Sequence, residues 1–200
     1  MIQTNFKYLE DYLLDQESEF ILEAYKSYLS SSKEFLKRPF ALKCPEYLLF
    51  LNDIEKVFSN STIVWVHRSP YDSILSYCPM IEKSWEFFRG KVDKKEIVDF
   101  IACLYKKMIL RAMESRKNIK NRIVDVSYSS LINDREQLII DLNKQIQSSY
   151  SYKSKGYKAN KKSESFYVNK YKFNSKEYEI DLDVIKKDFS FYYEEYREYL

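Results

Sequence analysis

The near absence of glycine is the strongest constraint on what this chain can fold into. Its 200 residues include only two glycines, Gly90 and Gly156. A phosphate-binding loop of the form GxxxxGK[ST], or a dinucleotide-binding GxGxxG turn, needs several glycines because the backbone must approach the ligand closely and adopt positive φ angles. Neither motif occurs in this sequence. Complete P-loop kinases and ordinary dinucleotide-binding domains are therefore excluded.

The cysteines and the histidine do not form a recognisable metal-binding pattern. Cys44, Cys78 and Cys103 lie far apart with no CxxC pair, and His67 is the single histidine. Such spacing is typical of reduced, semi-buried thiols in a cytosolic protein rather than of a zinc site. No apolar run approaches the length of a membrane span, and residues 1–14 carry acids that a signal peptide lacks. We therefore expect a cytoplasmic protein with no metal and no membrane span.

Positive charge is concentrated in one segment, although the net charge of the chain is only +3. Residues 153–162, KSKGYKANKK, are rich in lysine and contain no acid. The segment is interpreted either as a solvated loop or as a mobile lid over an anionic ligand. Lysines also alternate with tyrosines over 150–172, a pattern that can bind nucleic acid. Because Lys and Tyr are abundant throughout the chain, chance explains this alternation better, and we expect no nucleic acid partner.

Hydrophobic periodicity predicts alternating helices and strands. Strands are expected over 39–42, 62–67 and 122–127, and helices over 16–30, 46–58, 70–80, from 94 to about 112, from 129 or 130 to about 147, and over 181–199. The strand at 62–67 shows little alternation, so we expect both of its faces to be covered. This order predicts an α/β fold of three layers, with a mostly parallel sheet flanked by helices.

One domain over 1–200 is the simplest organisation, with an α/β core over 40–147, a polar lysine-rich loop over 148–178 and a C-terminal helix. Helical spacing predicts the inward side chains of three of the helices. They are Phe20, Ile21, Ala24, Tyr25, Tyr28 and Leu29 in the first, Ile97, Ile101, Leu104, Tyr105, Met108, Ile109 and Ala112 in the long central helix, and Leu182, Ile185, Phe189, Tyr192, Tyr193 and Tyr196 in the last.

Arg68 stands at the carboxyl end of a predicted strand, and Ser76 follows eight residues later. Ligands of open α/β sheets bind at such strand ends, and the N-terminus of the following helix favours anions. Arg68 and Ser76 can therefore hold one phosphate between them. The alternative is structural, because Arg68 can instead pair with Asp72 while Ser76 lies on the helix surface. The spacing alone leaves both interpretations open.

Residues 40–81 resemble the middle of a PAPS-dependent sulfotransferase, where PAPS is 3′-phosphoadenosine 5′-phosphosulfate. The resemblance is closest to the bacterial branch, which has an LK-x-P-x-x-L-x-x-L segment, a strand, and then R-x-P-x-x-x-x-x-S. The matching residues are Leu42, Lys43, Pro45, Leu48 and Leu51, then Ile63 to Arg68, and then Pro70 and Ser76. The resemblance implies a P-loop-NTPase-like sulfotransferase fold, and it implies that Arg68 and Ser76 bind the 3′-phosphate of the nucleotide.

Two further features of the resemblance concern the ends of the motif region. Residues 124–131, VDVSYSSL, are similar to the family's strand followed by Y-x-x-L, which implies that Tyr128 lies near the nucleotide. The family's 5′-phosphosulfate loop, often R-S-G-[ST]-[ST], has no counterpart before Lys43, where there is no glycine and no arginine before Arg38. The chain therefore looks like an N-terminally truncated, C-terminal part of the family domain.

The transfer chemistry that the resemblance implies points to Lys43 and Glu46. Lys43 can place positive charge on the leaving phosphate, and Glu46 can remove a proton from the acceptor if burial raises its pKa. Where the family often has a histidine after the LK-x-P segment, this chain has Tyr47. Glu46 can equally be a first-turn acid that stabilises a helix dipole. His67 is interpreted as a strand-end core residue, with a role as a neutral base as the alternative.

The resemblance implies one of two functions. The first is sulfuryl transfer from PAPS to a hydroxyl or amine acceptor of unknown identity, without a metal. The second is an inactive truncated remnant that binds adenosine 3′,5′-bisphosphate or serves as an interaction module. Loss of the first strand would expose a sheet edge, which predicts self-association or a partner chain over that edge.

Overall fold

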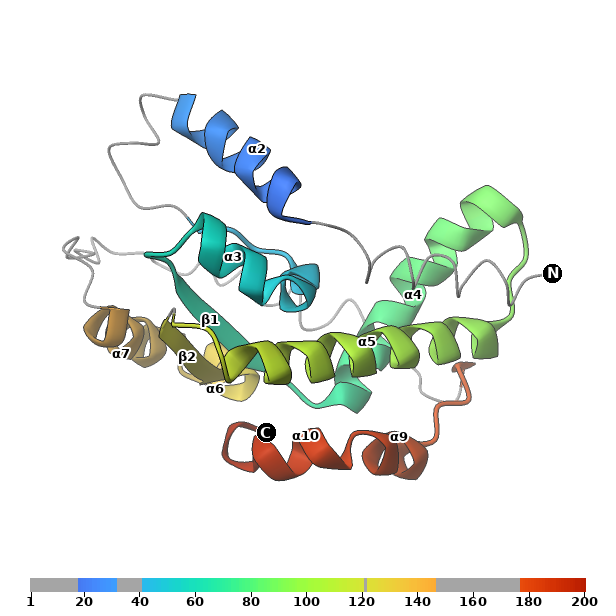
Figure 1. Ribbon diagram of the computed structural model, residues 1–200. Helices are drawn as coiled ribbons and strands as arrows, with labels where there is room; N and C mark the ends of the chain where they lie inside the picture. Colours follow the sequence, from blue (N-terminus) through green and yellow to red (C-terminus); the bar gives the residue numbers. More distant parts are fainter. Residues whose placement is uncertain (1–17, 32–40, 121, 147–176) are drawn as a thin grey trace. The chain divides into compact units, whose positions relative to one another are not determined.

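The computed structural model describes residues 18–31, 41–120, 122–146 and 177–200 (Figure 1). The chain divides into two compact units, the first made of residues 1–65 and 104–125 and the second of residues 66–103 and 126–200. Strands β1 (Thr62–His67) and β2 (Arg122–Ser127) and helix α5 (Lys94–Arg116) each have residues in both units. One domain over 1–200 stays a prediction.

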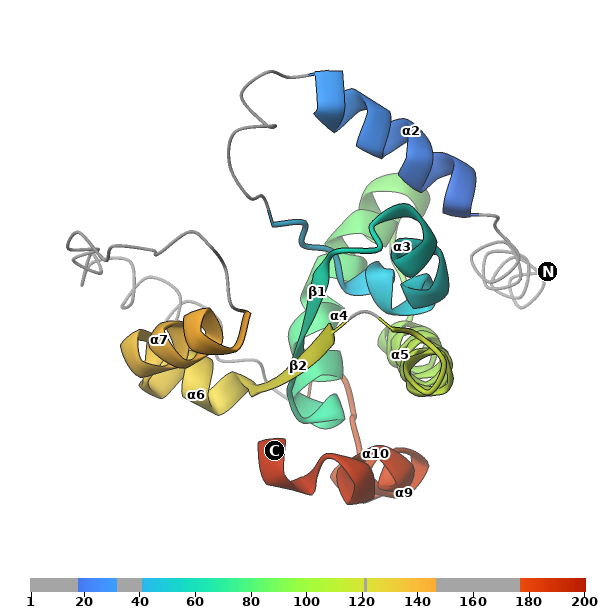
Figure 2. The same ribbon diagram turned by 60° about the vertical axis from the view of Figure 1, so that its left-hand side comes forward.

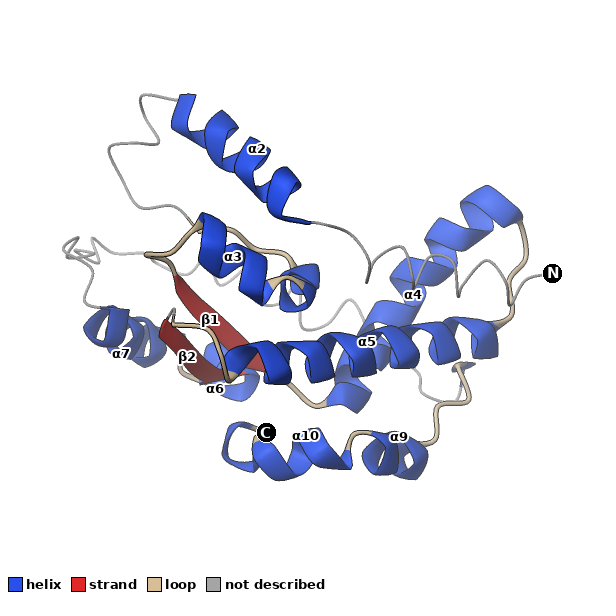
Figure 3. Ribbon diagram, in the orientation of Figure 1, coloured by secondary structure: helices blue, strands red, loops and turns tan. Residues whose placement is uncertain are grey.

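Strands β1 and β2 pair to form a two-stranded sheet, and both were predicted over these residues (Figure 3). Helices connect the two strands, as parallel pairing requires. In β1, Trp65 and His67 are buried, whereas Val64 and Val66 are 39% and 40% exposed. The expectation that both faces of this strand are covered is therefore wrong, because the end of the strand alternates as in a sheet with one covered face.

The predicted strand over 39–42 is wrong where the structure describes it. Residues 41–44 are in no regular element, and residues 39 and 40 lie outside the described residues. An extended segment becomes a strand only when a neighbouring strand accepts its hydrogen bonds, and the described part of the sheet contains only β1 and β2. The α/β alternation is thus present, and the described sheet is small.

In the first unit, helix α2 (Ser18–Ser31) packs against α3 (Leu51–Val57). The predicted helix over 16–30 is confirmed from residue 18 onward, but its predicted inward face is wrong at Ala24, Tyr25 and Tyr28, which are exposed, while Leu22 is buried. A tyrosine can lie on the exposed face of a helix because its hydroxyl forms hydrogen bonds with water. Phe20, Ile21 and Leu29 lie outside the side chains that the structure describes.

The predicted helix over 46–58 is divided in two. A 3₁₀ turn, η2 (Pro45–Leu49), precedes α3, and Phe50 between them has φ −124° and ψ 24°. Pro45 stands at the start of η2, as predicted from its fixed φ. Leu49 and Leu51 on either side of the break are both buried. The break therefore lets two consecutive short segments each bury an apolar side chain.

Helix α4 (Pro70–Arg89) forms the centre of the second unit and is longer than the predicted 70–80. It continues through Pro79 and ends at Gly90, whose φ is 77°. Two further helices follow β2, α6 (Tyr128–Asn133) and α7 (Arg135–Ile146), which lie side by side (Figure 2). One continuous helix was predicted there; the chain leaves helical geometry at Asp134, and Ser127 rather than Ser129 or Ser130 caps α6.

The C-terminal residues form α9 (Leu182–Asp188), α10 (Ser190–Glu195) and the 3₁₀ turn η4 (Arg197–Tyr199), and α9 packs against α4. The predicted inward residues Ile185, Phe189, Tyr192 and Tyr196 are buried, Tyr193 is half-buried, and Leu182 is 39% exposed because it is the first residue after the cap.

In α5, Ile97, Ile101, Met108, Ile109 and Ala112 are buried, as predicted, and Leu104 and Tyr105 are half-buried.

Most of the predicted loop over 148–178, including the lysine-rich residues 153–162, lies outside the described residues. None of the helices in the described ranges combines the length and the apolar character that crossing a bilayer requires. In the same ranges, no group of three or more His, Cys, Asp or Glu side chains is arranged to hold a metal ion.

Candidate functional site

Arg68 and Ser76, two of the predicted nucleotide-binding residues, are in direct contact. Arg68 follows the last residue of β1, and Ser69 caps α4 by accepting a hydrogen bond from the backbone N–H of Asp72. Two helical turns later, Ser76 Oγ accepts a hydrogen bond of 3.1 Å from Arg68 Nη1. Ser76 Oγ in turn donates to the carbonyl of Ser73 at 3.0 Å. The eight-residue spacing therefore brings the guanidinium and the hydroxyl together.

Tyr128, the third predicted nucleotide-binding residue, lies against the same guanidinium. It is the first residue of α6, directly after β2, and Arg68 Cζ is 4.6 Å from the centroid of its ring. A guanidinium at this distance over an aromatic face makes a cation–π contact. The second unit thus gathers Arg68, Ser76 and Tyr128 at the carboxyl ends of β1 and β2. We call these three residues together with Ser69 the strand-end cluster.

Arg68 has no carboxylate partner among the residues that the structure describes. Asp72, the partner that the structural alternative requires, is exposed in the first turn of α4 and forms no ion pair with it. A guanidinium has five N–H donors, and hydrogen bonds to the described residues occupy one of them, through Nη1. The cluster therefore combines a permanent positive charge, free donor capacity and a helix N-terminus, which together favour an anion.

Lys43 and Glu46, the two predicted transfer residues, belong to the first unit. Lys43 is exposed in the segment before η2, and Glu46 is half-buried in the first turn of η2. The Cys44 thiol donates to Glu46 Oε2 at 2.5 Å. Burial and this hydrogen bond raise the pKa of Cys44, so the thiol stays protonated at neutral pH. The first-turn position of Glu46 matches the structural alternative, and the carboxylate accepts a local hydrogen bond there.

The comparisons with known proteins identify the family. A model described as "Sulfotransferase family" matches residues 4–151, which is most of the chain. The chain belongs to the sulfotransferase family. No curated protein and no solved structure matched it. The family match contains Arg68, Ser76 and Tyr128 as well as Lys43 and Glu46, so it supports a sulfotransferase-like function, and it does not by itself assign a role to any of the five.

The C-terminal segment of this sulfotransferase-family chain also reaches the strand-end cluster. Tyr193 OH lies 3.0 Å from Ser69 Oγ, and Tyr192 OH lies 2.8 Å from Nδ1 of the fully buried His67. His67 is therefore a core histidine, as interpreted from the sequence. Sequence reasoning missed Ser69 and Tyr193 as site residues, because a chain with 19 tyrosines does not show which of them approach a strand end.

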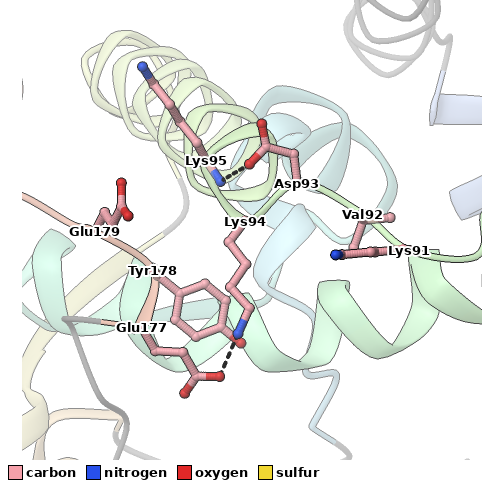
Figure 4. A pocket seen from close by; sticks show the side chains of 8 residues that line it. All are labelled: Lys91, Val92, Asp93, Lys94, Lys95, Glu177, Tyr178 and Glu179. Carbon is pink, nitrogen blue, oxygen red and sulfur yellow. Dashed lines mark hydrogen bonds and ion pairs between the residues drawn. The ribbon is translucent and has the colours of Figure 1, made fainter.

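A second cluster, formed by Glu82, Lys94, Glu177 and Tyr178, joins the C-terminal half of α4 to the start of α5. Lys94 Nζ lies 3.3 Å from Glu82 Oε1 and 2.5 Å from Glu177 Oε1, and Tyr178 OH donates to Glu82 at 2.5 Å. Three of its members, Lys94, Glu177 and Tyr178, line a pocket of about 600 Å³, in which the Lys94 amine points to Glu177 beside the Tyr178 ring (Figure 4). We call this the α5-start cluster. None of the predicted site residues lines this pocket.

Proposed function

We propose that this sulfotransferase-family chain binds PAPS and its product adenosine 3′,5′-bisphosphate, with Arg68 and Ser76 on the 3′-phosphate and Tyr128 beside the nucleotide. The observation that carries the proposal is the 3.1 Å contact between Arg68 and Ser76 at the end of β1, made by a guanidinium without a carboxylate partner in the described residues. The family match over residues 4–151 supports it.

The residues of the strand-end cluster fit a phosphate monoester. A phosphate offers three acceptor oxygens, and a guanidinium presents parallel N–H donors that match two of them. The start of α4, a helix of 20 residues, adds the positive end of its dipole. We also propose that the fold is the three-layer, P-loop-NTPase-like sulfotransferase fold. We further propose that the chain belongs to the bacterial branch of the family.

For the transfer step, PAPS supplies the sulfuryl group and an acceptor hydroxyl or amine receives it. We propose that Lys43 places positive charge on the departing phosphate and that Glu46 accepts the proton of the acceptor. Residues 1–42 contain no R-S-G-[ST]-[ST] sequence. The proposal therefore assigns the 5′-phosphosulfate contacts to a partner chain or to a segment other than these residues. We also propose that such a partner, or a second copy of the chain, extends the β1–β2 sheet.

Nucleotide binding without transfer is the second candidate function. One observation favours it: the Glu46 carboxylate already accepts a hydrogen bond from Cys44. In this case the strand-end cluster retains affinity for adenosine 3′,5′-bisphosphate, and the chain acts as a binding or interaction module. Both candidates share the nucleotide site, so one binding experiment tests what they have in common.

Calorimetric titration with adenosine 3′,5′-bisphosphate tests the proposal on the wild type, on Arg68→Ala and on Arg135→Ala. Arg135 opens α7 and makes no contact with the cluster in the described structure, so its variant removes the same charge elsewhere. We expect micromolar binding that Arg68→Ala removes and Arg135→Ala retains. No binding to the folded wild type, or equal loss in both variants, would contradict the site. A radiolabelled-sulfate assay on a panel of hydroxyl and amine acceptors then separates transfer from binding alone.

A further inference from the structure

The C-terminal helix α10 contacts the residues on both sides of Arg68. On one side, His67 Nδ1 and Tyr192 OH are 2.8 Å apart. On the other side, Ser69 Oγ and Tyr193 OH are 3.0 Å apart. Two consecutive tyrosines thus hold the residue before Arg68 and the residue after it. The backbone of Arg68 is fixed between two hydrogen bonds that originate more than 120 residues away in the sequence.

The contact at His67 is a buried, rigid anchor. His67 is fully buried, and Tyr192 and Tyr196 are only 3% and 4% exposed. The imidazole stacks on Tyr196 with ring centroids 4.2 Å apart, and the Tyr199 ring lies 5.1 Å away. Close-packed rings and a buried hydrogen bond restrict motion of the strand end. This anchor brings α10 close enough for Tyr193 to reach Ser69.

The contact at Ser69 lies at the position where an anion would bind. Ser69 is the N-cap of α4, and its hydroxyl accepts from the backbone N–H of Asp72 at 3.4 Å. The Ser69 and Tyr193 hydroxyls carry one hydrogen each, and their mutual hydrogen bond uses one of the two. The pair therefore keeps one O–H hydrogen that their mutual hydrogen bond does not use.

We propose that Tyr193 is a positioning residue for the nucleotide site: through Ser69 it sets the start of α4 and the orientation of Arg68, so that the C-terminal segment completes the site. The use of the site for a nucleotide rests on the proposed function above; the positioning of Arg68 does not. The role is carried by the Tyr193 hydroxyl rather than by its ring, which separates it from a simple packing contribution.

The test compares Tyr193→Phe with Tyr178→Phe. Each variant removes one phenol hydroxyl that hydrogen-bonds to a residue at or on α4, and Tyr178 does so at Glu82, away from Arg68. Titration with adenosine 3′,5′-bisphosphate is expected to give an affinity about threefold to tenfold weaker in Tyr193→Phe, the loss of one hydrogen bond. Tyr178→Phe is expected to keep the wild-type affinity. Wild-type affinity in Tyr193→Phe, with binding abolished in Arg68→Ala, would overturn the inference and leave the proposed function intact.

A second readout does not depend on the nucleotide. The Arg68 Nε–H signal in a ¹H–¹⁵N spectrum, assigned by its loss in Arg68→Lys, reports the position of the guanidinium over the Tyr128 ring. We expect this signal to move in Tyr193→Phe and not in Tyr178→Phe. If the wild type does not bind the nucleotide, the proposed function fails, and this signal decides the positioning alone: a shift supports it, and an unchanged signal overturns it.

Discussion

Two clusters that each contain one cation contact helix α4, one at its start and one in its C-terminal half, and they differ in what surrounds the cation. In the α5-start cluster, Lys94 lies between the carboxylates of Glu82 and Glu177, at 3.3 and 2.5 Å. In the strand-end cluster, Arg68 contacts a serine hydroxyl and a tyrosine ring. Hydroxyl and aromatic partners orient a cation without cancelling its charge.

The difference shows how a structural cation and a ligand-binding cation are distinguished. The hydrogen bond that Lys94 donates to Glu177 raises the pKa of Lys94, with Glu82 adding to the effect, so the charge of Lys94 is neutralised by these two carboxylates. Within the described ranges, Arg68 pairs with no carboxylate and donates one hydrogen bond, to Ser76. Lys94, at the start of α5, thus joins Glu82 of α4 to Glu177, whereas Arg68, just before the start of α4, is presented to an anion.

The largest expected effect comes from removing each cation in turn. Arg68→Met should weaken binding of adenosine 3′,5′-bisphosphate roughly 10- to 100-fold, because a charge-assisted phosphate contact contributes about 1.5–3 kcal/mol. Lys94→Met should leave the affinity unchanged and lower the free energy of unfolding by less than about 1 kcal/mol, since Lys94 is partly exposed. Calorimetry and urea denaturation measure the two quantities. If Lys94→Met weakened binding as much as Arg68→Met, the distinction between the clusters would be lost.

The integrity of α4 in every variant is checked at Cys78, which lies between the two clusters. Cys78 is fully buried, and burial raises the pKa of its thiol to about 12. We expect it to resist thiol reagents at pH 8, whereas the exposed Cys103 reacts. A variant in which Cys78 reacts as fast as Cys103 has an opened α4, and its binding data then report unfolding rather than site chemistry.

The next largest effect is expected when a carboxylate neutralises the charge of Arg68 in the strand-end cluster. Ser76→Asp places a carboxylate within reach of Arg68 Nη1, which now donates to the Ser76 hydroxyl. We expect nucleotide affinity to fall about tenfold or more, because the new carboxylate competes with the phosphate for Arg68. The matched neutral variant, Ser76→Asn, should lose no more than about threefold. Equal affinities for the Asp and Asn variants, measured calorimetrically, would show that Arg68 does not bind the phosphate.

The sequence predicted the elements that depend on local patterns. Strands 62–67 and 122–127 are rich in β-branched residues, and the start of α5 follows the capping residue Asp93, whose Oδ1 accepts from Lys95 N. The predictions failed where the outcome depends on distant partners. Residues 41–42 form no strand, and the helix that was predicted to end near residue 80 extends to Arg89, with Glu82 in contact with the distant Tyr178.

The site was predictable to the extent that spacing along a strand and a helix determines it. Arg68 follows the end of β1 and Ser76 lies in the second turn of the next helix, so their contact follows from sequence spacing, and Tyr128 follows from the end of the adjacent strand. Tyr193 was not predictable as a site residue because its contact with Ser69 depends on how α9 and α10 pack. Roles for Lys43 and Glu46 stay predictions.

A smaller effect is expected at the buried anchor beside the strand-end cluster. Tyr192→Phe removes the hydroxyl that lies 2.8 Å from His67 Nδ1, and both residues are almost fully buried. The loss of a buried hydrogen bond should lower the free energy of unfolding by about 1–2 kcal/mol, measured by urea denaturation. The exposed Tyr28→Phe on α2 is the matched control and should change it by less than about 0.5 kcal/mol. A Tyr192→Phe variant as stable as the control would mean that the anchor depends on ring packing alone.

The smallest expected effect is an alkaline dependence of the α5-start cluster. The pKa of Lys94 is raised above 10.5 by its hydrogen bond to Glu177, and burial raises the pKa of Tyr178 above 10.0. A group whose pKa is higher in the folded protein than in the unfolded chain stabilises the fold below its unfolded pKa and loses that contribution as the pH rises through its folded pKa. The stability difference between wild type and Lys94→Met should therefore shrink from pH 8 to pH 11, by less than about 1 kcal/mol because the cluster is partly exposed. The difference between wild type and Arg68→Met should stay constant over the same interval, since an arginine does not deprotonate there. If the stability difference between wild type and Lys94→Met were also constant, the two carboxylates would not hold Lys94 in solution. The cations of the two clusters would then not differ in their surroundings.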